Sequence, residues 1–130
     1  MLSRRFLLTS AALLAATAAA AQSAGPAAPF TQAGFEAAQA AGKAVIIEVT
    51  APWCPTCKAQ APIINSLMAR PEMKGVMLLK VDFDSQKDIL RTLRVAQQST
   101  LIAFKGKTET SRSIGDTTPA GIEKLFKSAM

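Results

Sequence analysis

Residues 44–58, AVIIEVTAPWCPTCK, carry the strongest structural signal in the chain. Residues 44–50 form a run of apolar and β-branched side chains, which predicts a strand buried on both faces. A turn containing Pro52 follows, and the apolar residues at helical spacing after Cys54 predict a helix. Cys54 and Cys57 therefore stand where a buried strand passes into a helix.

Apolar strands and amphipathic helices continue on both sides of this stretch. Strands separated by helices predict parallel crossovers, and the closely spaced last pair of strands predicts a hairpin. We therefore expect an α/β fold with a central mixed sheet of about four strands and helices on both faces. The predicted order is helix, strand, helix, strand, helix, strand, strand, helix, over residues 30–41, 44–50, 54–68, 76–83, 86–95, 100–104, 108–114 and 117–130.

The N-terminal segment, residues 1–21, has the pattern of a bacterial secretory signal. Two arginines precede an apolar stretch, and residues 19–21 (AAA) supply a cleavage site of small residues. A transmembrane anchor is the alternative, but this Ala-rich stretch is short for a bilayer. The twin arginines also fit an export route for folded proteins. We expect a cleaved signal, a flexible lead-in over residues 22–29, one domain over residues 30–130, and a periplasmic location.

The composition excludes several classes of chemistry. The chain has 130 residues, two cysteines and no histidine, which excludes Ser-His-Asp and Cys-His catalysis and His-ligated metal sites. No Gly-rich phosphate loop is present. The net charge is +6, but the basic residues form no run of Lys or Arg, and only 5% of residues are aromatic. We therefore expect no binding of nucleic acid. Chemistry carried by cysteine, chemistry carried by carboxylates, or no chemistry at all remains, and we expect no cofactor.

The Cys54–Cys57 pair at a helix N-terminus predicts a redox site. The free N–H groups and the dipole of the first turn favour the Cys54 thiolate, and Cys57, one turn on, can attack a mixed disulfide made by Cys54. Pro55 suits the first turn because its missing N–H costs nothing there, and Thr56 could offer a hydroxyl near the sulfur. Two alternatives stay open. One is a structural disulfide, although so small a loop constrains the unfolded chain little; the other is a soft-metal site, such as Cu(I) on two thiolates.

The chain resembles the thioredoxin superfamily from about residue 30 to residue 127. Residues 53–58 match the family's Trp-Cys-x-x-Cys-Lys run, and Pro62 matches its helix proline. Gly115 matches the glycine before the last helix, and residues 100–105 match the Thr-Leu-x-x-Phe-Lys strand. The resemblance implies a thioredoxin-like fold and a thiol-disulfide oxidoreductase.

A buried acid and a lysine also match the family. Glu48 stands where thioredoxins typically carry Asp, six residues before the first cysteine, and Lys80 matches the lysine of the next strand. Because the strand around Glu48 reads as fully buried, we expect a desolvated carboxyl with a raised pKa. We predict that Glu48 relays a proton to and from Cys57 and that Lys80 modulates it.

Ser99 departs from the family pattern. The residue before Thr100 is usually a cis-proline that packs against the disulfide and guides the substrate backbone. A cis bond before Ser99 would cost about 2.5–4 kcal/mol, so either the loop is trans or strain is stored there. The substitution also leaves the cysteine pocket less obstructed, which keeps metal or cluster binding open. We expect clients to contact the site through five residues: Trp53, Pro55, Thr56, Ser99 and Thr100.

The expected function is that of an exported, monomeric thiol-disulfide oxidoreductase that reduces client disulfides or maintains client thiols. No histidine lies between the cysteines, whereas strongly oxidising relatives carry one, so reduction is favoured. A disulfide oxidase or isomerase is the second hypothesis, and a copper- or cluster-binding protein is the third. The resemblance implies a membrane thiol-electron transporter as donor. It also implies cytochrome c maturation factors or damaged secreted proteins as clients.

Overall fold

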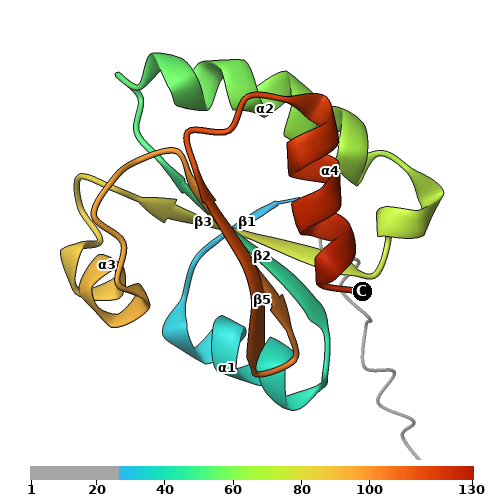
Figure 1. Cartoon of the computed structure of the whole chain (residues 1–130). Helices are drawn as coiled ribbons and strands as arrows, with labels where there is room; N and C mark the ends of the chain where they lie inside the picture. The colour runs from blue at the N-terminus through green and yellow to red at the C-terminus, as the bar shows by residue number, and fades with distance from the viewer. Residues whose placement is uncertain (1–26) are drawn as a thin grey trace, which may run out of the picture.

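The computed structural model describes residues 27–130, which form a five-stranded mixed sheet with helices on both faces (Figure 1). The predicted signal over residues 1–21 and most of the predicted lead-in lie outside the described residues. The strands are β1 (Ala28–Pro29), β2 (Ala44–Thr50), β3 (Val76–Asp82), β4 (Thr100–Lys105) and β5 (Thr108–Ile114). The helices are α1 (Gln32–Ala40), α2 (Pro55–Met68), α3 (Lys87–Leu93) and α4 (Pro119–Ser128), with a 3₁₀ turn, η1, at Pro71–Met73.

The sheet has the order β1-β3-β2-β4-β5, one strand more than the four or so expected. The additional strand, β1, lies within the segment expected to be a flexible lead-in, and it pairs in parallel with β3 through Ala28 and Leu79. Its two residues are too few to show an alternating pattern. Pro29 is tolerated there because β1 is an edge strand.

The direction of β4 corrects a second expectation. A helix separates β3 from β4, which predicted a parallel crossover, but β4 runs antiparallel to β2, with Leu101 opposite Glu48. Residues 83–99, which contain α3, leave the sheet at the C-terminal end of β3 and return to it at the same end, next to β2. Because β4 starts at that end, it runs antiparallel to β2. The predicted hairpin of β4 and β5 is confirmed.

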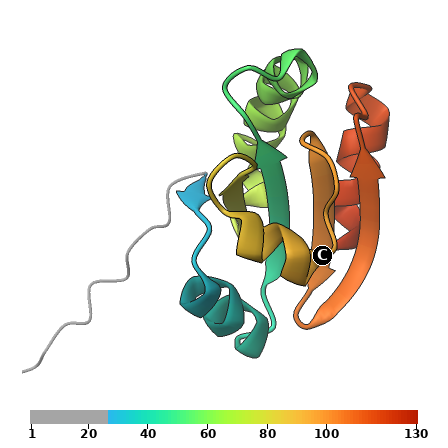
Figure 2. The same ribbon diagram turned by 90° about the vertical axis from the view of Figure 1, so that its left-hand side faces the viewer.

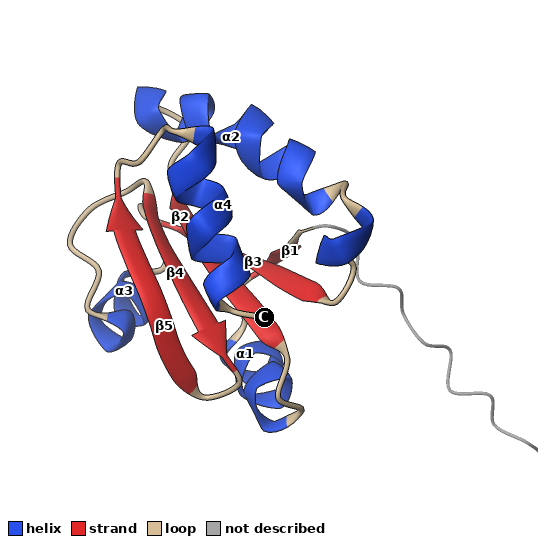
Figure 3. Ribbon diagram, turned by 45° about the vertical axis from the view of Figure 1, so that its right-hand side comes forward, coloured by secondary structure: helices blue, strands red, loops and turns tan. Residues whose placement is uncertain are grey.

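Alternation along β2 divides the core into two layers. Val45 and Ile47 face one layer and Ile46 faces the other, and all three are fully buried. The first layer holds the apolar residues of α1 and α3, which lie on the same side of the sheet (Figure 2). The second holds those of α2 and α4, and Figure 3 shows α4 lying across the near side of the sheet.

The same alternation fixes the direction of Glu48. Successive side chains of a strand point to opposite faces, so Glu48 shares the face of Ile46, toward α2. The cysteine helix and the buried acid are therefore on the same side of the sheet. Within residues 27–130, no helix combines the length and the apolar character needed to cross a bilayer.

Candidate redox site

The cysteine pair lies at the end of β2, where the chain enters α2. The Cys54 amide N–H donates to the Ala51 carbonyl at 3.2 Å, and Cys54 is the extended N-cap of α2, with Pro55 in the first turn. The Cys54 Sγ accepts a hydrogen bond from the Cys57 amide N–H at 3.1 Å. The two residues form a disulfide, with their Cα atoms 5.3 Å apart. The predicted position of Cys54 at the helix N-terminus is confirmed.

Both cysteines are buried. Cys54 is 0% exposed and Cys57 is 5% exposed, and they pack with Ala51 and Phe83. In the dipeptide between them, Pro55 is exposed and Thr56 is half-buried. Access to the sulfur atoms therefore depends on the segments that surround them.

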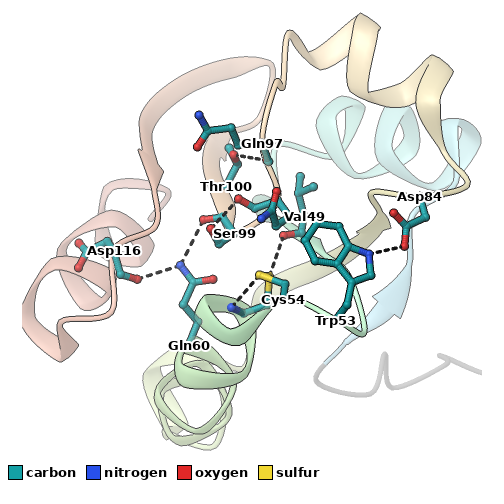
Figure 4. The surroundings of a disulfide bond; sticks show 11 residues. Val49, Trp53, Cys54, Gln60, Asp84, Gln97, Ser99, Thr100 and Asp116 are labelled. Atoms are coloured by element: carbon teal, nitrogen blue, oxygen red, sulfur yellow. Dashed lines mark hydrogen bonds between the residues drawn. A yellow bond between two sulfur atoms is a disulfide. The ribbon is translucent and has the colours of Figure 1, made fainter.

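Trp53 forms one side of these surroundings. The residue is 55% exposed, and its Nε1 donates to the Asp84 carboxylate at 2.9 Å (Figure 4). The indole meets the Phe83 ring edge-to-face, with centroids 6.3 Å apart, and the Lys87 ammonium lies 4.2 Å from the centroid of that ring. These contacts hold a large apolar surface beside Cys54.

The turn before β4 forms the other side, and its geometry resolves the alternatives at Ser99. Every described peptide bond is trans, and Ser99 adopts a left-handed conformation with φ of 60°. Its amide N–H donates to the Val49 carbonyl at 2.8 Å, and its carbonyl accepts from the Gly115 amide N–H at 3.0 Å. A left-handed conformation is unfavourable for a residue with a Cβ, so the backbone of Ser99 is strained. The two hydrogen bonds hold it in this conformation.

Thr100, the other predicted docking residue of this turn, is buried. Its Oγ1 donates to the Gln97 carbonyl at 2.7 Å, so its hydroxyl stabilises the turn itself. A direct polar contact from Thr100 to a client stays a prediction.

Glu48 and Lys80 are directly opposite one another on β2 and β3. The Glu48 side chain is buried, and the Lys80 Nζ lies 3.9 Å from its Oε2, which makes no hydrogen bond with residues 27–130. Burial raises the pKa of the Glu48 carboxyl above its ordinary value of 4.5, and the positive charge of Lys80 offsets part of this rise. The structure thus agrees with the expected desolvated acid.

A pocket of about 640 Å³ opens beside Cys57. Its lining includes Glu48, Lys58 and Lys80, and residues 27–29 form part of its wall. The buried carboxyl and the second cysteine therefore both line one cavity.

The comparisons with known proteins agree with this geometry. A family model described as Thioredoxin matches residues 27–128. The chain is 39% identical over 71 residues to a thioredoxin of Chlamydia trachomatis serovar D, a match covering 55% of this chain and 68% of that one. It is 32% identical over 95 residues to thioredoxin-2 of Saccharomyces cerevisiae, covering 72% and 88%. The crystal structure of Trxlp from Edwardsiella tarda EIB202 aligns with a TM-score of 0.74 at 42% identity, covering 76% and 97%.

This chain belongs to the thioredoxin family. The Cys54–Cys57 pair is accordingly the CxxC pair of a thiol-disulfide oxidoreductase rather than a purely structural cross-link. Among residues 27–130 of this thioredoxin, no group of three or more His, Cys, Asp or Glu side chains gathers in a way that could hold a metal ion.

The predictions from the sequence pattern do not include two residues that lie near the disulfide. Asp84 holds the Trp53 indole, and Gln60 is a buried polar residue on α2. Gln60 had a detectable signal, because it lies at helical spacing among apolar residues that face the core. Asp84 had none, since its role depends on a contact 31 residues away in the chain.

Replacing Ser99 with proline should destabilise this thioredoxin. Proline fixes φ near −65° and lacks the N–H that bonds to Val49, and the lost hydrogen bond alone should lower the free energy of unfolding by about 1–3 kcal/mol. Ser99→Gly is the matched variant. It relieves strain of about 1–3 kcal/mol and costs about 0.5–1 kcal/mol of backbone entropy, so it should be neutral or stabilising. Urea denaturation measures both, and a proline variant as stable as the parent would contradict the left-handed turn.

Replacing Glu48 with Gln should stabilise the protein increasingly as pH rises. Because the pKa of Glu48 is raised by burial, the folded protein holds this proton more tightly than the unfolded chain. Stability is then lost as pH rises from 4.5 through the folded pKa, and Gln does not share this loss. The measurement is the difference in unfolding free energy between Glu48→Gln and the parent, from about pH 4 to about pH 9. Glu36→Gln, which removes an exposed carboxylate from α1, controls for net charge, and a Glu48 difference no steeper than this control would refute desolvation.

Proposed function

We propose that this protein is exported to the periplasm and there reduces disulfides, or maintains thiols, in client proteins. The secretory pattern of residues 1–21 supports export. The dipeptide Pro55-Thr56, which has no histidine, supports a reducing role over the alternative role of oxidase or isomerase. A monomer suffices for this exchange, because one chain holds both cysteines and the acid.

The hydrogen bond from the Cys57 N–H to the Cys54 Sγ carries this proposal. In the reduced protein, the same N–H and the start of α2 favour a thiolate on Cys54. That thiolate attacks one sulfur of a client disulfide, forming a bond between Cys54 and the client and releasing the first client thiolate. The Cys57 thiolate then attacks the Cys54 sulfur, which forms the disulfide of this structure and releases the second client thiolate. Two electrons pass from the cysteine pair to the client.

Glu48 handles the proton of the second step. Cys57 must lose its proton before it attacks, and a carboxyl with a raised pKa accepts a proton more readily at neutral pH than an ordinary one. We propose that a water molecule in the pocket that both residues line carries the proton between them. Lys80, at 3.9 Å from the carboxyl, limits how far its pKa rises.

A periplasmic reductant needs a source of electrons, because that compartment is kept oxidising. A membrane thiol-electron transporter would attack the Cys54–Cys57 disulfide and return both cysteines to thiols. Cytochrome c maturation factors and damaged secreted proteins are the proposed clients.

The reduction potential tests the direction of electron flow. We expect a value near that of thioredoxin, about −270 mV, measured by equilibrating the mature protein with glutathione redox buffers. A value near −120 mV would reject the reducing role and indicate an oxidase.

Single cysteine variants test the order of attack. Cys54→Ser should lower disulfide reduction to the background rate, because the attacking thiolate is gone. Cys57→Ser should still attack a client but fail to release it, so a mixed disulfide should accumulate and be visible by mass spectrometry. Asn65→Ser, on an exposed position of the same helix, is the control. The proposed roles are reversed if Cys54→Ser is the variant that traps the client.

A further inference from the structure

Gln60 is a buried polar residue on the cysteine helix that the exchange reaction described above does not use. It lies three residues after Cys57, so it is on the same side of α2, and it is only 1% exposed. Its side-chain Oε1 is buried and makes no hydrogen bond with the described residues. An amide that is only partly satisfied is a poor choice for stability alone, since a buried apolar side chain of the same size avoids the unpaired oxygen.

The Nε2 of Gln60 ties together two segments that are distant in the chain. It donates to the Ser99 carbonyl at 3.2 Å and to the Asp116 carbonyl at 2.8 Å, across 39 and 56 residues. The Ser99 carbonyl also accepts from the Gly115 N–H. One side chain of α2 therefore holds the turn before β4 and the turn before α4 together.

This turn is connected to the disulfide through a single carbonyl. The Ser99 N–H donates to the Val49 carbonyl at 2.8 Å, and the Cys57 Sγ lies 4.0 Å from the same oxygen. Figure 4 shows Gln60 and Ser99 on one side of the disulfide and Trp53 on the other. Because the sulfurs are buried, a client must approach between these two sides.

We propose that Gln60 is a positioning residue for disulfide exchange. It holds Ser99 in the left-handed conformation that the side chain of Ser99 disfavours, and so fixes the turn against which a client lies. This inference rests on the proposed function, since it concerns how clients dock at the same cysteine pair.

The test replaces Gln60 with Met, which has a similar length and no N–H donor. Reduction of insulin disulfides, with dithiothreitol as electron donor, should show a KM at least about fivefold higher and a kcat changed less than about twofold, because docking is loosened while the cysteines are intact. The amide N–H groups of Ser99 and Gly115 should exchange with deuterium at least about tenfold faster. The amides in the middle of β2 should be unaffected.

Two controls separate positioning from general destabilisation. Asn65→Met removes an exposed amide from the same helix and should leave KM and exchange unchanged. Phe35→Leu weakens the core around α1, on the opposite face of the sheet, and should lower overall stability without changing KM.

The outcomes distinguish this inference from the proposed function. A Gln60→Met variant with parental KM and parental exchange at Ser99 and Gly115 overturns the positioning role. A KM increase of the same size in Phe35→Leu overturns it too, because the effect is then one of stability. If the parent protein itself fails to reduce insulin, the proposed function fails, while the exchange rates still decide whether Gln60 holds the turn.

Discussion

The Cys54 Sγ stands at the start of α2, where the Cys57 N–H points at it from 3.1 Å, and the rest of the site is arranged around this contact. This contact exists because β2 ends at Thr50, shortly before Cys54, and the chain then enters a helix that begins with Pro55. The first turn of any helix has N–H groups without partners, and here a sulfur atom occupies the place of the usual capping oxygen. The helix cap and the nucleophile are thus the same residue, so that a change in the entry to α2 would alter both stability and reactivity.

The second requirement is the acid beneath the helix. Period-two alternation in β2 turns Glu48 toward α2, and the parallel register with β3 sets Lys80 directly opposite. A carboxyl in this position is disfavoured as an anion, which gives it a raised pKa but also lowers the stability of the fold at neutral pH. Lys80 moderates this conflict without removing it, because its Nζ is 3.9 Å away, beyond a good hydrogen bond.

Much of this architecture could be predicted from the sequence, because strands and helices with strong periodicity identify themselves locally. The strand at residues 44–50 and the cysteine helix are examples, whereas the pairing of Glu48 with Lys80 is expected only from the resemblance to the thioredoxin superfamily. What could not be predicted depends on the path of the chain in three dimensions. The two residues of β1 carry no pattern, and the direction of β4 depends on where segment 83–99 returns to the sheet. The left-handed conformation of Ser99 depends on hydrogen bonds to Val49 of β2 and to Gly115 before α4, so the sequence around Ser99 does not reveal it.

The burial of both sulfurs makes those nonlocal contacts functionally important. If the disulfide were exposed, its reactivity would depend mainly on the helix N-terminus, and the turn at Ser99 would matter little. With Cys54 fully buried, the surrounding segments decide which disulfides can approach and at what angle. The exposed Trp53 on one side is held by Asp84, in the turn after β3, and the strained turn on the other side is held by Gln60 of α2. Under the proposed function, selectivity among clients would depend on these supporting contacts, whereas the chemistry of exchange depends on the helix that carries the cysteines.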